Sequence, residues 1–238
     1  MSRISFENFG ARARADLSYS EKAGRHGFQQ AAEARMADDV AAKMRLGPDD
    51  TLLEIGCGTG NLLLPIASRV ARATGIDHPD CIASLRSRPG AERLELLEGN
   101  FLDLSIGRRY SRVLVYSVIH YLGSLDEAKA FLSRAAGMLA PGGLLMVGDI
   151  PNEDRRRRFL DTPEGKRVAE EHARLRAQSG APSPAGLAPD PHLVRLDDAA
   201  VAALCRHLEA EGLVPRVVPQ PPDLPFGHTR EDLLAEKP

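Results

Sequence analysis

The stretch from Leu52 to Asn61 constrains the fold more than any other part of the chain. It reads LLEIGCGTGN, an apolar run followed by three glycines at alternating positions. This pattern predicts a buried strand that turns through glycines into a helix. Glycine lets the backbone approach a ligand with no Cβ in the way, and the start of a helix leaves N–H groups free. A flat, polar cofactor can therefore lie against this turn.

Further strand-like segments follow the glycine turn at spacings that leave room for a helix in most gaps. The predicted strands cover residues 51–55, 72–76, 93–97, 112–116, 143–147, 213–218 and 232–236. Strands that alternate with helices predict a parallel sheet covered on both faces. The last two strands are separated by only about a dozen proline-rich residues, too few for a crossover helix, so they are expected to pair antiparallel.

The chain divides into four parts of one expected domain, residues 1–238. They are a helical cap (1–47), a core (48–150), an insertion or lid (151–196), and a C-terminal helix with the last two strands (197–238). Apolar residues recur every four positions from Phe28 to Met44, which predicts an amphipathic helix. The insertion combines a charged helical stretch with a loop over 179–191, and long segments of this kind are usually lids or binding elements.

Composition narrows the classes of partner and compartment. Lys and Arg total 31 against 33 Asp and Glu, a net charge of −2, which gives no electrostatic footprint for nucleic acid or anionic lipid. The sequence has neither an apolar run near the ~18 residues of a membrane span nor a secretory signal pattern, so we expect a cytoplasmic protein. Three scattered cysteines and the absence of closely spaced histidine pairs predict neither a disulfide framework nor a metal site.

Two acidic residues flank the glycine turn. Glu54 stands two positions before the first glycine, and Asp77 ends the second predicted strand. A carboxylate at the end of that strand can accept hydrogen bonds from both hydroxyls of a ribose. A nicotinamide dinucleotide fold shares this arrangement, but its fingerprint is GxGxxG. The carboxylate of Glu54 would also repel a pyrophosphate, whereas a cofactor that carries an ammonium group would tolerate or use it.

With Glu54, the G-x-G-x-G run and Asp77, the chain resembles the class I S-adenosylmethionine-dependent methyltransferases. Their first motif is E/D-x-G-x-G-x-G, and their second is an acid that closes the next strand. The resemblance covers roughly residues 51–150. It extends to Asn100 and Phe101 after the third strand, where the family usually has Asp before an apolar residue; Asn keeps an acceptor oxygen but loses a charge. The resemblance implies an α/β, Rossmann-like fold and S-adenosyl-L-methionine as the cofactor.

The resemblance also implies roles for individual residues. Those expected to bind the cofactor are Glu54, Gly56, Cys57, Gly58, Gly60, Asn61, Asp77, His78, Asn100, Phe101, Tyr116, Ser117 and Arg25. Arg25 is expected to pair with the methionine carboxylate, as such N-terminal segments close over the cofactor. Those expected to contact the acceptor are Tyr19, Tyr121, Asp149 and Asn152.

His120 is the candidate catalytic residue. It stands a few residues beyond the fourth predicted strand, where the family places groups that face the acceptor. A neutral imidazole at that position can remove a proton from a hydroxyl as the methyl group moves. Local packing is the alternative role for this side chain.

We predict methyl transfer to a hydroxyl oxygen of a small molecule or glycan precursor. No Asp/Asn-Pro-Pro-Tyr run, the usual mark of methylation on exocyclic amines, follows the fourth strand. Residues 148–152, 158–160, 224–227 and 230–232 resemble a bacterial subgroup associated with polysaccharide biosynthesis. Two alternatives are an NAD-dependent oxidoreductase with a Rossmann fold and a catalytically silent subunit that binds S-adenosylmethionine. The oligomeric state, a homodimer included, is left open.

Overall fold

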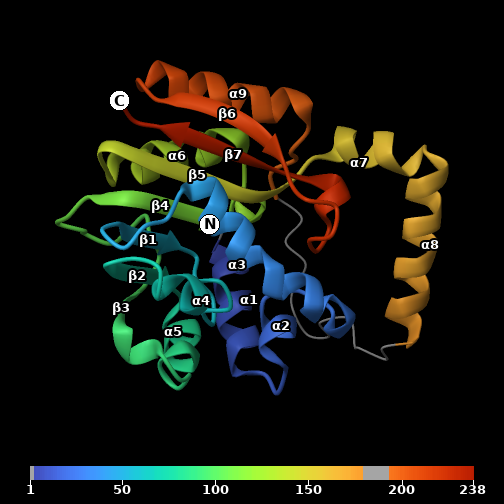
Figure 1. Ribbon diagram of the computed structural model, residues 1–238, viewed down its shortest axis with the longest axis horizontal. Coiled ribbons are helices and arrows are strands. Elements are labelled where there is room, and N and C mark those ends of the chain that lie inside the picture. Colours follow the sequence, from blue (N-terminus) through green and yellow to red (C-terminus); the bar gives the residue numbers. More distant parts are fainter. Residues whose placement is uncertain (1–2, 179–192) are drawn as a thin grey trace.

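The computed structural model describes residues 3–178 and 193–238 of the chain (Figure 1). Its strands are β1 (Thr51–Ile55), β2 (Arg72–Asp77), β3 (Leu94–Glu98), β4 (Tyr110–Tyr116), β5 (Leu139–Pro151), β6 (Val214–Pro219) and β7 (Arg230–Glu236). Within the described residues they form one seven-stranded sheet in the order β3-β2-β1-β4-β5-β7-β6. β7 runs antiparallel to both of its neighbours, and the other pairings are parallel. The predicted mostly parallel sheet with an antiparallel last strand is confirmed.

Helices precede, connect and follow the strands. The α-helices are α1 (Arg3–Arg14), α2 (Tyr19–Lys22), α3 (Gln30–Met44), α4 (Leu63–Ala67), α5 (Pro79–Arg86), α6 (Leu125–Gly137), α7 (Glu153–Leu160), α8 (Pro163–Gln178) and α9 (Asp198–Ala210). Short 3-10 turns lie at η1 (Gly27–Gln29), η2 (Ala91–Arg93), η3 (Ile119–Tyr121) and η4 (Gly227–Thr229). No helix within residues 3–178 and 193–238 has the length and apolar character to cross a membrane.

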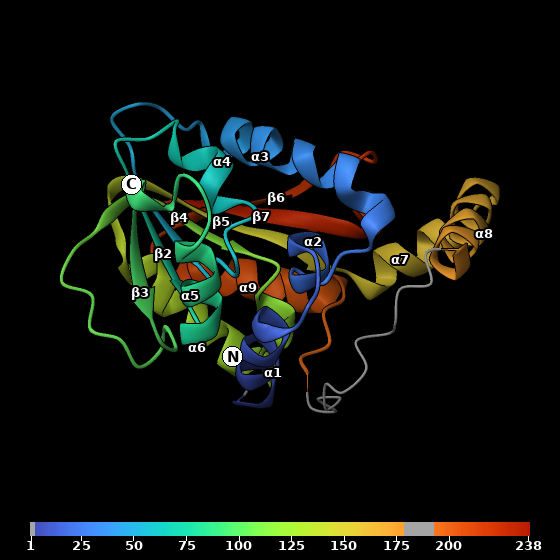
Figure 2. The same ribbon diagram turned by 90° about the horizontal axis from the view of Figure 1, so that it is seen from below.

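The sheet carries an apolar core on each face. Neighbouring residues of a strand point to opposite faces, so Leu52 packs in one core and Leu53 in the other. The core that contains Leu52 is closed by side chains of α3, α4 and α5, and the core that contains Leu53 is closed by α6 and α9. Figure 2 shows α3 and α4 on one side of the sheet and α6 and α9 on the other. Both faces are covered, as the alternation of strands and helices predicts.

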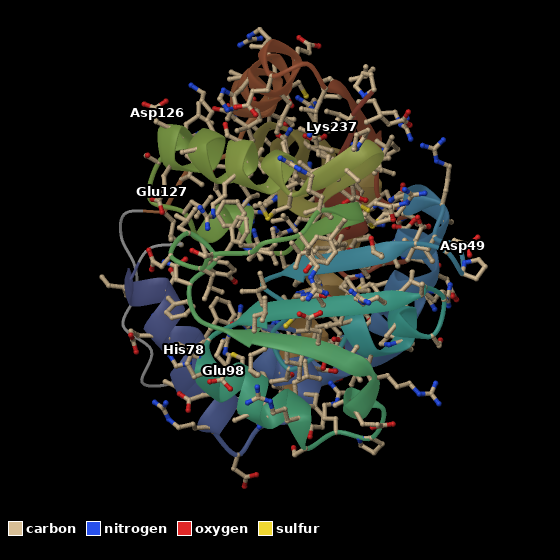
Figure 3. All side chains as sticks on the ribbon, turned by 90° about the vertical axis from the view of Figure 1, so that its left-hand side faces the viewer. Asp49, His78, Glu98, Asp126, Glu127 and Lys237 are labelled. Atoms are coloured by element: carbon tan, nitrogen blue, oxygen red, sulfur yellow. The ribbon has the colours of Figure 1, made fainter. Side chains whose placement is uncertain are left out.

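The ends of the parallel strands define one edge of the sheet. In Figure 3, His78 and Glu98, which follow β2 and end β3, lie on the opposite side of the molecule from Asp49, which precedes β1. The chain passes from β1 outward to β2 and β3 and later returns to place β4 on the other side of β1. Ligands of open α/β sheets bind at the carboxyl ends of the strands where the strand order reverses. The ends of β1 and β4 are therefore the place to examine.

Most strand ends lie within two residues of the prediction, whereas β5 and the helix predicted from Phe28 differ more. β5 is longer than the predicted 143–147 because Leu139 already pairs with Tyr110 of β4, and Ile150 still pairs with β7. The helix predicted from Phe28 starts as the turn η1 before α3 begins. Phe28 is only partly buried, whereas Met36, Val40 and Met44 are buried, so the predicted apolar face holds for the later turns.

The segment between β5 and α9 contains the predicted charged helical stretch as two helices. α7 follows β5 directly, and α8 projects away from the sheet in both Figure 1 and Figure 2. His172 of α8 packs its ring against those of His26 and Phe28, so α8 touches the N-terminal part of the chain. The predicted loop over 179–191 lies outside the described residues.

Candidate functional site

A cavity opens at the carboxyl ends of β1, β2 and β4, under the N-terminal segment. Its volume is about 830 Å³ including its open mouth. Strand ends supply Glu54, Gly56, Cys57, Gly58, Asp77, Tyr116, Ser117, Val118 and Tyr121 to its lining. The N-terminal segment and nearby helices supply Phe9, Ala13, Lys22, Ala23, Arg25, Glu33, Met36, Thr59, Asn61, Leu62 and Cys81. The structure thus brings most of the residues predicted from the glycine turn to one cavity.

The three glycines of the turn have different tasks. Gly56, Gly58 and Gly60 all have positive φ angles, which favour glycine. A Cβ on Gly56 would lie 2.3 Å from a methyl of Val118, and one on Gly60 would lie 2.3 Å from a methyl of Leu85. A Cβ on Gly58 would meet no atom within 4 Å. Gly56 and Gly60 therefore permit close packing, whereas Gly58 leaves open a surface against which a ligand can lie.

Asp77 is held in place by the turn itself. Its Oδ2 accepts a hydrogen bond from the N–H of Gly58 at 2.6 Å, and its Oδ1 accepts one from the N–H of His78 at 2.6 Å. Burial raises the pKa of this carboxyl, and the two backbone hydrogen bonds oppose that rise. Each carboxylate oxygen has a second lone pair for a further donor. The side chain is thus fixed at the border of the cavity with acceptor capacity to spare.

Glu54 is a buried carboxyl group in the same cavity. Its exposed fraction is 2%, and its Oε2 has no hydrogen-bond partner among the described residues. Burial, together with the charge of Asp77, raises the pKa of Glu54 to about 8, so the group is largely protonated at neutral pH. Buried polar atoms without a partner are rare in folded proteins. A cationic ligand group beside Glu54 would supply the missing partner and favour the carboxylate.

A narrower cavity adjoins the first beyond Asp77, which lines both. Its volume is about 310 Å³ including its opening. Phe6 of α1, Asn100, Phe101 and Val118 are among its lining residues. Asn100 uses its Oδ1 to accept a hydrogen bond from the N–H of Leu102 at 3.2 Å. Apolar side chains with one amide and the carboxylate of Asp77 thus surround a space that suits a flat heterocycle, and an adenine contact of Asn100 and Phe101 stays a prediction.

Arg25 is the buried cation of the site. Its exposed fraction is 8%, and its Nε has no hydrogen-bond partner among the described residues. Its Nη2 donates to Ser117 Oγ at 3.4 Å and lies 3.7 Å from Asp149 Oδ2. Ser117 in turn donates to Asp149 Oδ2 at 2.5 Å. The guanidinium lines the cavity and keeps donor capacity for an anionic ligand group.

Asp149 lies behind the cavity wall and interacts with an arginine on each of two sides. Its Oδ2 faces Arg25, and its Oδ1 lies 3.6 Å from Nε of Arg230. Its backbone N–H donates to Asp232 Oδ1 at 2.8 Å. Asp149 does not line the cavity of the glycine turn, although the sequence predicts an acceptor contact there. In this structure it instead orders Ser117 and Arg25.

His120 lies in the η3 turn that follows β4. Its imidazole is not part of the cavity lining, and its Nδ1 is buried with no hydrogen-bond partner among the described residues. Burial and the charge of Arg230 lower the pKa of His120 to about 4, so the ring is neutral at physiological pH. The ring lies 4.2 Å, centroid to centroid, from that of Tyr121, which does line the cavity.

Two residues predicted to contact the acceptor are used elsewhere. Tyr19 is 40% exposed, and the guanidinium of Arg88 lies 4.0 Å above the centre of its ring, outside this cavity. Asn152 is the N-cap of α7, and its Nδ2 donates to Asp198 and Glu231. Neither side chain lines the cavity in this structure.

The structure gives three of the predicted cofactor residues other surroundings than a direct polar contact with a ligand would need. His78 caps α5, because its Nδ1 accepts a hydrogen bond from the N–H of Asp80. Asn61 lines the cavity and donates to the backbone oxygen of Tyr19 and to Glu33. Cys57 also lines the cavity, but burial raises the pKa of its thiol, so it is not a reactive thiolate.

The N-terminal helix contributes side chains that sequence reasoning missed. Phe9 and Ala13 of α1 line the main cavity, and Phe6 lines the narrower one. The available signal was the spacing of Phe6, Phe9 and Ala13, which puts them on one helical face. That spacing does not say what the face covers.

No group of three or more metal-ligating side chains is found in the part of the chain that the structure describes.

Comparison with protein families matches residues 52–143 to a model described as a methyltransferase domain. Chondramide synthase cmdD of Chondromyces crocatus is 34% identical over 114 residues, which cover 44% of this chain and 3% of that protein. The dTDP-3-amino-3,4,6-trideoxy-alpha-D-glucopyranose N,N-dimethyltransferase of Streptomyces venezuelae is 31% identical over 124 residues, which cover 51% of each chain. The similarity thus spans a small part of the synthase and about half of the dimethyltransferase.

Solved structures resemble the whole fold. The crystal structure of N-methyltransferase NodS from Bradyrhizobium japonicum WM9, in complex with S-adenosyl-L-homocysteine, has a TM-score of 0.64 at 16% sequence identity. The superposition covers 99% of both chains. At this level of sequence identity the similarity shows the fold alone. It includes parts of this chain that lie outside the matched methyltransferase domain.

Proposed function

We propose that this chain, which belongs to the class I S-adenosylmethionine-dependent methyltransferases, methylates a hydroxyl group of a small molecule or glycan precursor. The observation that carries the proposal is the convergence of Glu54, Gly58 and Asp77 on one cavity. An unpartnered carboxyl, an open glycine face and a fixed carboxylate together suit an amino-acid nucleoside. The family assignment does not favour the nicotinamide-dependent oxidoreductase or the silent subunit.

The described residues fit S-adenosylmethionine part by part. Asp77 is proposed to accept hydrogen bonds from the ribose hydroxyls, and the narrow cavity at Asn100 and Phe101 to take the adenine. Glu54 provides the partner for the ammonium group, and Arg25 the partner for the carboxylate. When bound, S-adenosylmethionine supplies a methyl group activated by a positively charged sulfur.

The chain's own contribution is mainly orientation and the exclusion of water. The segment after β4 brings Ser117, Val118 and Tyr121 to the cavity wall, and Phe9 of α1 closes that wall from the other side. The rings of Phe9 and Tyr121 meet edge to face at 4.8 Å. Holding two reactants in line removes much of the entropic part of the barrier, and apolar walls keep water from competing as an acceptor.

We propose that His120 acts as a general base and accepts the proton that the acceptor hydroxyl loses. The low pKa of His120 keeps its imidazole in the base form throughout the physiological range. The same low pKa limits the driving force of proton transfer, so its contribution is expected at the low end for a general base. Asp149 opposes the effect of the two nearby arginines on this pKa and so favours the protonated ring that forms during transfer.

The glycan part of the proposal draws on the relatives. The Streptomyces venezuelae relative is named for the N,N-dimethylation of a dTDP amino sugar. Oxygen is preferred to nitrogen for this chain because residues 117–121 read SVIHY and lack the run typical of enzymes that methylate exocyclic amines. Sugar hydroxyls are therefore the first acceptors to examine.

The test is release of S-adenosylhomocysteine by the purified protein with matched acceptors. Nucleotide sugars that differ in one position, hydroxyl against amine, are incubated with S-adenosylmethionine, and products are identified by mass spectrometry. We expect methylation of the hydroxyl member of a pair. Turnover of amine members alone would overturn the choice of oxygen, and no turnover in a protein that binds S-adenosylhomocysteine would favour the silent subunit.

A further inference from the structure

A second cavity adjoins the proposed cofactor cavity on the far side of an aromatic wall. Its volume is about 380 Å³ including its mouth, and it is lined by Ser5, Asn8, Phe9, Arg12, Tyr121 and Leu193. Phe9 and Tyr121 line both cavities. Two rings thus form the shared wall, at the end of β4 where an acceptor must approach. This second cavity is called the outer cavity below.

Arg12, in the last turn of α1, is the cationic group of the outer cavity. Its Nε is buried and has no hydrogen-bond partner, and its guanidinium pairs with no carboxylate of residues 3–178 or 193–238. Arg14, two residues further on the same helix, forms an ion pair with Asp80. Of these two arginines of α1, only Arg14 has a carboxylate partner in the part of the chain that the structure describes.

The charges around Tyr121 do not balance. The charges of Arg12, Arg25 and Arg230 act to lower the pKa of its phenol, and the carboxylate of Asp149 acts to raise it. Arg25 and Arg230 share that carboxylate at 3.7 Å and 3.6 Å. Arg12 has no anionic partner within residues 3–178 and 193–238. A partly buried guanidinium without a counter-ion is costly, and its planar array of donors matches carboxylate and phosphate oxygens.

Building on the proposed function, we infer that the acceptor is an anion whose carboxylate or phosphate binds Arg12 in the outer cavity. Its hydroxyl then points toward the methyl group beside Phe9 and Tyr121, the two residues that line both cavities. Arg25 stays with the cofactor carboxylate, and Arg230 stays with Asp149. The bound anion supplies the partner that Arg12 lacks. Hydroxy acids, sugar acids and phosphorylated sugars satisfy this requirement, and neutral sugars do not.

The first test measures binding rather than activity. Protein saturated with S-adenosylhomocysteine is titrated with inorganic phosphate and, separately, with acetate, and binding is followed by calorimetry. We expect Arg12→Met to weaken the binding of at least one anion by about 10- to 100-fold, the usual effect of losing a charged hydrogen-bond partner. Arg14→Met removes the same charge from the same helix and should leave this affinity unchanged. Arg12→Lys, which keeps the charge, should restore part of it.

The second test uses turnover with acceptors in matched pairs. A hydroxy acid is compared with its amide, and a sugar phosphate with the free sugar. We expect Arg12→Met to raise KM for the anionic member by about 10- to 100-fold with little change in kcat, and to leave the neutral member unaffected. A change in KM for the hydroxy acid would indicate that Arg12 binds a carboxylate. A change in KM for the sugar phosphate would indicate that it binds a phosphate.

The outcomes separate this inference from the proposed function. If Arg12→Met keeps its affinity for both anions and its KM for anionic acceptors, the inference is wrong while methyl transfer stands. Equal turnover of neutral and anionic members by the wild type has the same consequence. If the wild type does not bind S-adenosylhomocysteine, the proposed function fails, and the inference fails with it. Unchanged affinity of Arg12→Met for S-adenosylhomocysteine shows that the variant is folded.

Discussion

The two sides of the aromatic wall are built in different ways. On the proposed cofactor side, Glu54, Gly58, Asp77 and Asn100 follow one another at the ends of adjacent strands. On the proposed acceptor side, Phe9, Arg12, Tyr121 and Leu193 come from segments separated by long stretches of chain. Strand register fixes the first set, whereas the packing of α1 and of loops against the sheet fixes the second.

Because the two sides are built differently, we expect substitutions on each side to change different properties of the protein. The cofactor side is made of backbone turns and short side chains with little freedom, so changes there should act on affinity for S-adenosylhomocysteine. The proposed acceptor side is made of long side chains that come from α1 and from the turn after β4, such as Arg12 and Tyr121. Changes there should act on turnover and on the choice of acceptor.

Gly58→Val should abolish detectable binding of S-adenosylhomocysteine. A Cβ on Gly58 points into empty space within the cavity, and the φ angle of +54° disfavours a β-branched residue. Calorimetry measures the loss. Gly142→Val is the matched control, because Gly142 also has a positive φ and an unobstructed Cβ but lies at the start of β5, away from the cavity. Equal loss of binding in both variants would assign the effect to backbone strain.

His120→Ala should lower kcat by about 10²-fold with little change in affinity for S-adenosylhomocysteine. Because the pKa of His120 is about 4, wild-type kcat should stay level between pH 8 and pH 6 and fall only as the pH approaches 4. Initial rates across this range measure both effects. His207→Ala, on α9, serves as the control. An inflection near pH 6.5 that disappears in His120→Ala would show a histidine in a more polar setting than this one.

Asp77→Ala should weaken the binding of S-adenosylhomocysteine by about 10- to 100-fold, as expected for the loss of charged hydrogen bonds to a ribose. The backbone N–H groups of Gly58 and His78 lose their acceptor as well. Calorimetry measures the change, and Asp126→Ala, which removes a highly exposed carboxylate, should have no effect. An unchanged affinity in Asp77→Ala would mean that the ribose lies elsewhere.

Binding of S-adenosylhomocysteine at pH 7 should release close to one proton, and the release should fall to zero above pH 9 and again below the pKa that Glu54 has in the complex. Glu54 is largely protonated in the empty cavity because its pKa is about 8, and an ammonium group beside it favours the carboxylate. Calorimetry in two buffers of different ionisation enthalpy counts the proton. Glu54→Gln should remove the release, and the difference between the two proteins should vanish above pH 9. A wild-type titration with no buffer dependence at pH 7 would place the ammonium away from Glu54.

The sequence predicts the cofactor side better than the acceptor side for a physical reason. The sequence brings Asp77 and Asn100 together because parallel strands end at one edge, and in the structure both residues line one cavity. The sequence predicts acceptor contacts for Tyr19 and Asn152 because they lie near motifs. In the structure a cation, the guanidinium of Arg88, lies above the ring of Tyr19, and the side chain of Asn152 caps α7. Sequence position does not reveal such local partners.

Arg12 and Phe9 were missed for the complementary reason. The amphipathic pattern of α1 gives one apolar face, but it does not tell which surface that face covers. The structure shows α1 against α5 and the end of β4, where Phe9 reaches Tyr121. A lone arginine at the end of a helix has no sequence signal that separates it from Arg14. Its role is visible only when its partners, or their absence, are known.

The most direct test of the account is a titration of the purified wild-type protein with S-adenosylhomocysteine, with NAD⁺ as the comparison ligand. The account predicts saturable binding of one S-adenosylhomocysteine per chain and no binding of NAD⁺. Failure of S-adenosylhomocysteine to bind at millimolar concentration, or binding of NAD⁺ in its place, would contradict it.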